Sequence, residues 1–198
     1  GVRLVGSEMC IRDSPIGAEI KDLDLTNFNE QESNQIKNSF LEYSVLVFRN
    51  QMLNPEQLKS ISTLWGEPLV HPVFKGIDGH PEIIEIKNFG EKYHTNAHWH
   101  SDVTFEDSPP DATLLYSIVV PDEGGDTLFS SQHLAYNDLD SKLKSDLADK
   151  VAVHSNIGVL MLSGQDPKNA KTVEHPIFRS HPETCLLYTS DAADDTPC

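Results

Sequence analysis

Cysteine is nearly absent from this 198-residue chain, and the positions of the few that occur exclude a disulfide framework. Cys10, Cys185 and Cys198 all lie near the two ends, and no cysteine lies between Cys10 and Cys185. Cysteines confined to the ends cannot cross-link a core or supply the paired ligands of a structural zinc site. The chain is therefore neither a disulfide-stabilised secreted scaffold nor a zinc finger.

Basic side chains are also scarce. Lysine and arginine together number 15 against 31 aspartates and glutamates, and the formal net charge is -16. A nucleic-acid partner requires a basic surface that neutralises phosphates, so we expect no such partner. The acidity by itself identifies no other partner.

Long apolar runs are missing as well. No stretch reaches the length of roughly 20 residues that a membrane-spanning helix needs, and the N-terminus lacks the apolar segment of a secretion signal. Hydrophobic residues make up 38% and charged residues 23% of the chain, which is typical of a soluble globular protein. We expect a cytoplasmic protein without a membrane partner and with a sizeable core.

The two ends differ in composition from the rest of the chain. Residues 1–14 show no clean periodicity, and residues 185–198 finish in a polar run. Both resemble peptides that arise when sequencing-adapter DNA is translated at the edges of an assembled sequence. We predict an artefactual tail at 1–14, a partial domain at 15–184 and a second artefactual tail at 185–198, with ordinary terminal segments as the alternative.

Hydrophobic periodicity predicts a mostly β chain with flanking helices, arranged as a sandwich or barrel-like sheet. The segment 113–120 is apolar enough to be buried on both faces, and Gly124 and Gly125 favour a turn that leads into a further strand. The expected strands are 15–25, 44–48, 82–86, 113–120, 127–129, 151–154 and 175–182, and the expected helices are 29–43, 55–65, 131–137 and 141–150.

Two imidazoles and a carboxylate alternate along residues 98–102. If residues 98–105 are extended, His98, His100 and Asp102 project from one face while Trp99 and Ser101 project from the other. Non-haem iron oxygenases bind their metal through two histidines and one carboxylate on a single face of the ion. His100 and Asp102 therefore have the chemistry of two neighbouring iron ligands, although His-x-Asp alone is a weak signal.

A larger, ordered set of motifs resembles the taurine dioxygenase (TauD/TfdA) family over 15–184. The set comprises His71-Pro72, Asn96, Trp99-His100-Ser101-Asp102, Pro109-Pro110, Gly124-Gly125-Asp126-Thr127, His175-Pro176, Arg179 and His181-Pro182. The resemblance implies an incomplete double-stranded β-helix (jelly-roll) and an Fe(II)- and 2-oxoglutarate-dependent dioxygenase. Such an enzyme consumes O2, hydroxylates a small, anionic, taurine- or sulfonate-like substrate, and releases succinate and CO2.

The resemblance also implies residue roles. His100 and Asp102 would bind iron, Thr127 would bind the 2-oxoglutarate carboxylate, and His71 and Asn96 would contact the substrate. For Thr127 the alternative is an ordinary threonine after a turn. For His71 and Asn96 it is a polar group at a loop edge.

The third iron ligand, a histidine, and the arginine that pairs with 2-oxoglutarate come later in the family order than any residue of this chain. His175 and His181 precede them and are not assigned to these roles. The chain by itself is expected to bind iron weakly without turnover. Trp99 is expected to pack, and Arg179 and His154 are interpreted as structural.

Three residues depart from the pattern of taurine enzymes. Phe74 replaces a tyrosine, and Val159 and Leu160 replace a Ser-Phe pair near the substrate. Because buried polar groups discriminate strongly between substrates, their loss indicates that a less polar or a different anionic substrate fits as well as taurine.

Two other functions stay open at this point. His98, His100 and Asp102 also fit the His-x-His-x-Asp pattern of a zinc hydrolase, although Val103 stands where such enzymes usually have another histidine. A non-catalytic jelly-roll binding domain is the third possibility. The oligomeric state is not indicated, and a homo-oligomeric parent protein is compatible with the sequence.

Overall fold

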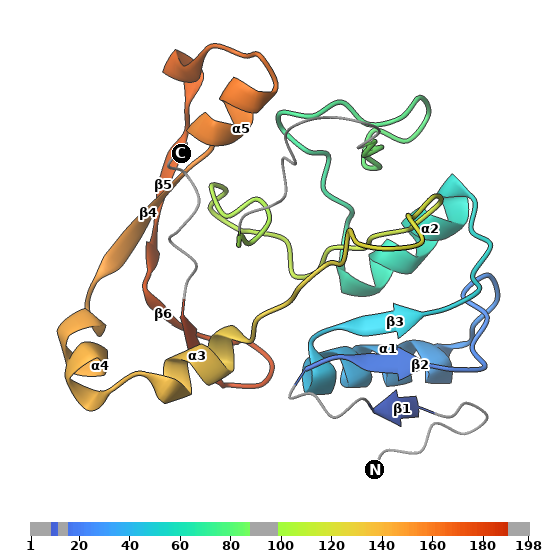
Figure 1. The fold of residues 1–198 in the computed structure, drawn as a ribbon, viewed down its shortest axis with the longest axis horizontal. Helices are drawn as coiled ribbons and strands as arrows, with labels where there is room; N and C mark the ends of the chain where they lie inside the picture. The colour runs from blue at the N-terminus through green and yellow to red at the C-terminus, as the bar shows by residue number, and fades with distance from the viewer. Residues whose placement is uncertain (1–8, 12–15, 88–98, 190–198) are drawn as a thin grey trace. The chain divides into compact units, whose positions relative to one another are not determined.

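The computed structural model describes residues 9–11, 16–87 and 99–189 (Figure 1). Two compact units divide the chain, and each takes two separate segments of it. Unit 1 comprises Gly1–Pro68 and Leu114–Ser131, and unit 2 comprises Leu69–Thr113 and Gln132–Cys198.

Unit 1 contains a three-stranded sheet in the order β1-β2-β3, made of β1 (Met9–Ile11), β2 (Ala18–Ile20) and β3 (Leu46–Phe48). β1 and β2 pair antiparallel, whereas β2 and β3 pair parallel. A parallel pair needs a crossover, which helix α1 (Glu30–Tyr43) provides. The strands predicted at 15–25 and 44–48 are confirmed in shorter form.

Asparagine side chains begin both helices of unit 1. At α1, Asn29 Oδ1 accepts from the Glu32 amide at 3.0 Å, and Glu32 Oε2 accepts from the Asn29 amide at 2.8 Å. Helix α2 (Pro55–Ser62) repeats this capping box with Asn54 and Gln57. Because each box satisfies two otherwise open backbone N–H groups, the helix starts follow directly from the sequence.

A 3-10 turn, η1 (Thr63–Trp65), extends α2 before the chain leaves the helix at Gly66, where φ is +123°. This left-handed backbone suits glycine, which carries no Cβ. The predicted helices at 29–43 and 55–65 are therefore confirmed.

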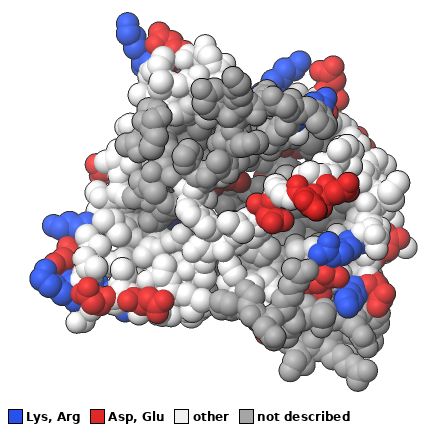
Figure 2. Space-filling model, in the orientation of Figure 1, with Lys and Arg blue, Asp and Glu red and all other residues white. Residues whose placement is uncertain are grey.

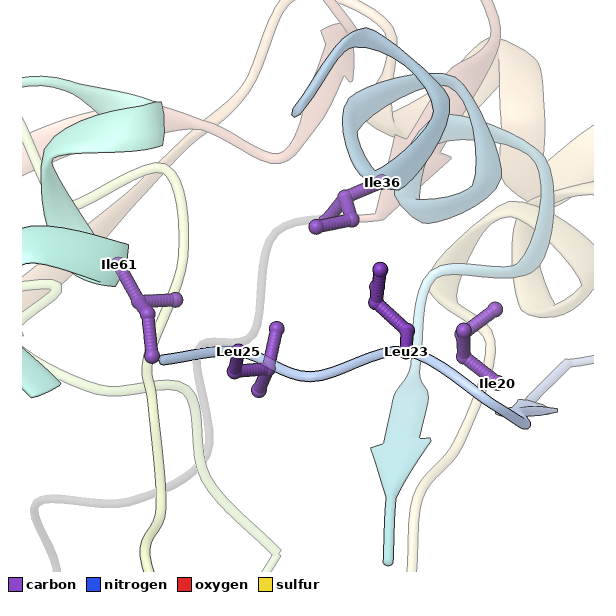
Figure 3. Packing of buried hydrophobic residues seen from close by; sticks show 5 residues of the cluster. All are labelled: Ile20, Leu23, Leu25, Ile36 and Ile61. Carbon is purple, nitrogen blue, oxygen red and sulfur yellow. The ribbon is translucent and has the colours of Figure 1, made fainter. Parts of the chain in front are cut away.

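The core of unit 1 lies between its sheet and its two helices (Figure 3). Ile36 of α1 is 2% exposed, and Ile61 of α2 is 4% exposed. The backbone that follows β2 is clamped by Gln51, whose side-chain amide accepts from Leu25 N and donates to Leu23 O, both at 2.9 Å. These two hydrogen bonds hold Leu23 and Leu25 against the helices, although the segment pairs with no described strand.

Unit 2 contains two antiparallel strand pairs and three α-helices among its described residues. Helix α5, which was not predicted, connects β4 to the segment that leads into β5 (Figure 1). The predicted helices at 131–137 and 141–150 and the predicted strand at 151–154 are confirmed. The elements are α3 (Gln132–Asp138), α4 (Ser141–Leu147), β4 (Val151–Ser155), α5 (Ile157–Leu162), η2 (Pro167–Asn169), β5 (Thr172–Pro176), β6 (Phe178–Ser180) and β7 (Leu187–Thr189).

Three predicted strands are wrong. Residues 113–120 and 127–129 belong to no strand, although Gly124 and Gly125 do adopt the left-handed turn conformation, with φ +77° and +73°. In 113–120 Leu114 and Tyr116 are half-buried, whereas Leu115 is 69% and Ile118 80% exposed. Within this apolar segment, a side chain such as Leu114 is half-buried because it packs against the core of unit 1, and the apolar side chains without such a contact are exposed. Residues 82–86 also belong to no strand; Glu82 lies in a turn that is closed by a hydrogen bond from Ile83 N to His80 O at 3.1 Å.

The sheets that the structure describes are small, with two or three strands each. On the face drawn in Figure 2, lysine and arginine side chains of the described residues lie singly or in small groups beside acidic ones. No helix within the described residues is long and apolar enough to cross a membrane.

Replacing Ile36 by alanine should lower the free energy of unfolding of unit 1 by about 2–5 kcal/mol, because it leaves a cavity in a small core. Ile118→Ala removes the same atoms from an 80% exposed position and should change the free energy by less than about 0.5 kcal/mol. Urea denaturation measures both variants. Equal effects would contradict the assigned core.

Candidate metal centre

Asp102 lies at the start of a turn that spans residues 102–105. Val103 has φ +56°, the left-handed conformation that β-branched residues rarely adopt, and Glu106 N donates to Val103 O at 3.1 Å. Phe105 is 4% exposed and fixes the turn in the interior of unit 2. The expected extended conformation for 98–105 is therefore wrong from Asp102 onward.

His100 and Asp102 nevertheless approach each other. His100 Nε2 lies 3.3 Å from Asp102 Oδ1, and the two side chains are 39% and 45% exposed. The other carboxylate oxygen of Asp102, Oδ2, accepts a hydrogen bond from Thr113 Oγ1 at 3.0 Å. The two oxygens of Asp102 thus have different neighbours, and a ligand that enters beside His100 would meet Oδ1.

The turn that carries Asp102 is attached to strand β5 by His175. This histidine is 5% exposed, and its Nε2 lies 2.9 Å from Thr104 O and 3.1 Å from Glu106 O. Since a carbonyl oxygen only accepts, Nε2 must carry a hydrogen and share it between the two oxygens. The ring also packs in a T-shaped arrangement with that of His154, which is 4% exposed, with the ring centroids 5.0 Å apart.

A second connection to the same turn comes from Lys171. Its Nζ lies 2.8 Å from Glu106 Oε2 and 3.3 Å from Asp107 Oδ2. The hydrogen bond to Glu106 is the main cause that raises the pKa of Lys171. The backbone N–H of Lys171 donates to the Asn156 side chain, and the Lys171 carbonyl accepts from Asn156 N. These two hydrogen bonds fix the backbone from which the Lys171 side chain reaches Glu106 and Asp107.

His71 is half-buried in the same unit and has a defined tautomer. Its Nδ1 accepts hydrogen bonds from Val73 N at 3.1 Å and from Phe74 N at 3.0 Å. Burial lowers the pKa of His71, and the charges of Asp102 and Glu106 oppose that shift without reversing it. His71 is therefore a neutral imidazole at pH 7, with its hydrogen on Nε2.

The His100–Asp102 pair fits two adjacent positions on one metal ion. Two ligands at right angles, each about 2.1 Å from an octahedral ion, lie about 3.0 Å apart, close to the observed 3.3 Å. Within the described ranges, no group of three or more His, Cys, Asp or Glu side chains is arranged to hold a metal. The described part of the chain therefore offers two side chains, and not three, to such a site.

Among the other predicted site residues, His71 belongs to the same unit as this pair, and its pKa is influenced by the charge of Asp102. Asn96 and His98 are outside the described residues, and Thr127 is an exposed residue of unit 1. Trp99 is 58% exposed, so the expectation that it packs is wrong. Sequence reasoning did not assign a role beside Asp102 to Thr113, which lies 11 positions away and belongs to no recognisable motif.

Phe74 and Leu160 both depart from the pattern of taurine enzymes, but their side chains differ in exposure. Phe74 is 37% exposed, and its ring centroid lies 4.9 Å from that of His71. Leu160 is 3% exposed in α5, where it packs in the interior. Phe74 therefore provides an apolar surface beside His71, whereas Leu160 does not present its side chain to solvent.

Residues 11–193 match the family model described as "Taurine catabolism dioxygenase TauD, TfdA family". The chain belongs to the TauD/TfdA family. It is 33% identical to an alkylsulfatase from Acinetobacter baylyi, over 85% of this chain and 57% of that protein. It is also 33% identical to an alpha-ketoglutarate-dependent sulfate ester dioxygenase from Pseudomonas putida, over 84% of this chain and 60% of that protein.

A solved structure of a taurine dioxygenase from Burkholderia xenovorans is similar, with a TM-score of 0.76 and 32% identity over 93% of this chain and 63% of that one. The chain thus spans about three fifths of the length of these relatives. The comparisons favour neither the zinc hydrolase nor the non-catalytic binding domain.

The lowered pKa of His71 predicts a specific pH dependence of stability. The unfolded chain takes up a proton near pH 6.5, whereas the folded chain resists it, so the free energy of unfolding should fall as the pH drops below about 6.5. His71→Gln should remove this contribution, because glutamine does not titrate. Urea denaturation at pH 7.5, 6.5 and 5.5 measures the difference, and identical slopes in both proteins would contradict the assignment.

His175→Phe should destabilise unit 2 by about 1–3 kcal/mol, because it removes the N–H donor for two carbonyl groups beside a buried ring. His175→Gln keeps an N–H donor of similar reach and serves as the matched control, with a smaller loss. Urea denaturation compares the two variants. A glutamine variant as unstable as the phenylalanine variant would show that ring packing, and not hydrogen bonding, holds the turn.

Proposed function

We propose that this chain forms part of an Fe(II)- and 2-oxoglutarate-dependent dioxygenase that hydroxylates a small anionic organic molecule. The observation that carries the proposal is the 3.3 Å approach of His100 Nε2 and Asp102 Oδ1 in a member of the TauD/TfdA family. The family relationship supports a double-stranded β-helix as the fold of the complete domain. A third histidine ligand and an arginine for 2-oxoglutarate are assigned to the part of the relatives that this chain does not cover.

His100 and Asp102 would hold the iron at two adjacent positions, and the carboxylate charge would offset part of the charge of the metal. Bound iron supplies the oxidative chemistry, in which 2-oxoglutarate and O2 are consumed, succinate and CO2 are released, and a C–H bond of the substrate becomes C–OH. These side chains would hold the iron and leave space on it for 2-oxoglutarate and O2.

His71 is suited to bind an anionic substrate without carrying a charge. Its Nδ1 is occupied by two backbone amides, so the remaining polar atom is an Nε2–H donor. Because burial lowers the pKa of His71, this imidazole would donate to the substrate as a neutral group at pH 7. Asn96 would be a further substrate contact, and the Thr127 hydroxyl would donate to a carboxylate of 2-oxoglutarate.

The substrate class is best described as a sulfonate or sulfate ester with an apolar group. Two relatives are named for sulfate esters, one as an alkylsulfatase and one as a sulfate ester dioxygenase. Phe74, beside His71, offers an apolar surface where taurine enzymes carry a tyrosine hydroxyl. A small molecule in the cytoplasm is the proposed partner.

Release of succinate from 2-oxoglutarate by the full-length protein tests this proposal. Turnover should require Fe(II), O2 and an alkyl sulfate or alkanesulfonate, and it should fall below detection in His100→Ala and Asp102→Asn. His133→Gln, in helix α3, serves as the control and should keep turnover. Turnover that persists in His100→Ala, or hydrolysis that proceeds without 2-oxoglutarate, would overturn the proposal.

A further inference from the structure

The two oxygens of the Asp102 carboxylate are differentiated by their surroundings. Oδ1 lies 3.3 Å from His100 Nε2, and Oδ2 accepts from Thr113 Oγ1 at 3.0 Å. A free carboxylate can rotate about its last bond and can bind a metal through either oxygen or through both. The hydroxyl of Thr113 opposes that rotation, because turning the group would break a hydrogen bond to an ionised acceptor.

The side chain of Thr113 lies on the solvent side of its segment. Thr113 and Leu115 are exposed, whereas Ala112 and Leu114 are half-buried. Threonine is also restricted at χ1, which limits the positions that its hydroxyl can take.

The turn that carries Asp102 is fixed independently of Thr113. His175 binds the carbonyl oxygens of Thr104 and Glu106, and Phe105 is buried. Loss of the Thr113 hydroxyl should therefore leave the backbone of the turn in place and free only the carboxylate. This separation allows the effect of carboxylate orientation to be measured on a folded protein.

We infer that Thr113 is a positioning residue that occupies Oδ2 of Asp102 and thereby reserves Oδ1 for the metal. The inference rests on the proposed iron site and deepens it. Hydrogen-bond partners of metal ligands typically change metal affinity by about 10- to 100-fold when they are removed. Because both side chains are partly exposed to water, which can replace the lost hydroxyl in part, we expect an effect at the lower end of that range.

Titration of the metal-free full-length protein with Mn(II), followed by the electron paramagnetic resonance signal of free Mn(II), tests the inference. Thr113→Val has nearly the same shape without the hydroxyl, and it should weaken Mn(II) binding about tenfold. Thr113→Ser restores the hydroxyl and should bind within about twofold of the unchanged chain. Thr172→Val makes the same replacement at an exposed threonine of β5 and should have no effect.

Thermal melts and the metal affinity of the ligand variants distinguish a failure of the Thr113 inference from a failure of the metal assignment. Thermal melts should coincide for the unchanged chain, Thr113→Val and Thr113→Ser, and a loss of affinity that follows a loss of stability would assign Thr113 to packing alone. Unchanged Mn(II) affinity in Thr113→Val would overturn the inference while leaving the metal site intact. Mn(II) binding that is absent, or that persists in both His100→Ala and Asp102→Asn, would overturn the metal assignment and the role of Thr113 with it.

Discussion

The hydrogen bonds from His175 to the turn at 102–105 are the constraint on which the candidate site depends. They join residues about 70 positions apart and lie in the interior of unit 2. Val103 in this turn has a left-handed backbone that a β-branched residue adopts only at a cost, so the surrounding contacts must stabilise it. Phe105, Lys171 and Thr113 supply the remaining contacts that hold Asp102 beside His100.

This arrangement places structural and functional roles in different side chains. His175 donates from its Nε2 to backbone carbonyls in the interior, whereas His100 and Asp102 face each other and are partly exposed. A buried histidine that orders a turn and an exposed histidine that faces a carboxylate look alike in a sequence. Burial and the partners of each ring nitrogen distinguish them.

The helices were predictable because their signals are local. Asn29 with Glu32 and Asn54 with Gln57 form capping boxes within four residues, and the structure begins α1 and α2 at those positions. Strands depend on partners elsewhere in the chain. The apolar segment 113–120 carries a strong strand pattern, yet no described strand includes it, and its outer side chains remain exposed. Helix α5 was missed because its run of apolar residues has no clear cap.

The sequence by itself determined the family, the helix starts and the identity of the two candidate iron ligands, because motif order and capping depend on neighbouring residues. It predicted an extended strand through Asp102, which would have brought His100 and Asp102 to one face by alternation. Only the tertiary structure showed that a turn begins at Asp102, that Thr113 donates to its carboxylate and that His175 binds the backbone that follows. Contacts over 11 and about 70 positions leave no periodic trace in a sequence, since they depend on how distant segments pack.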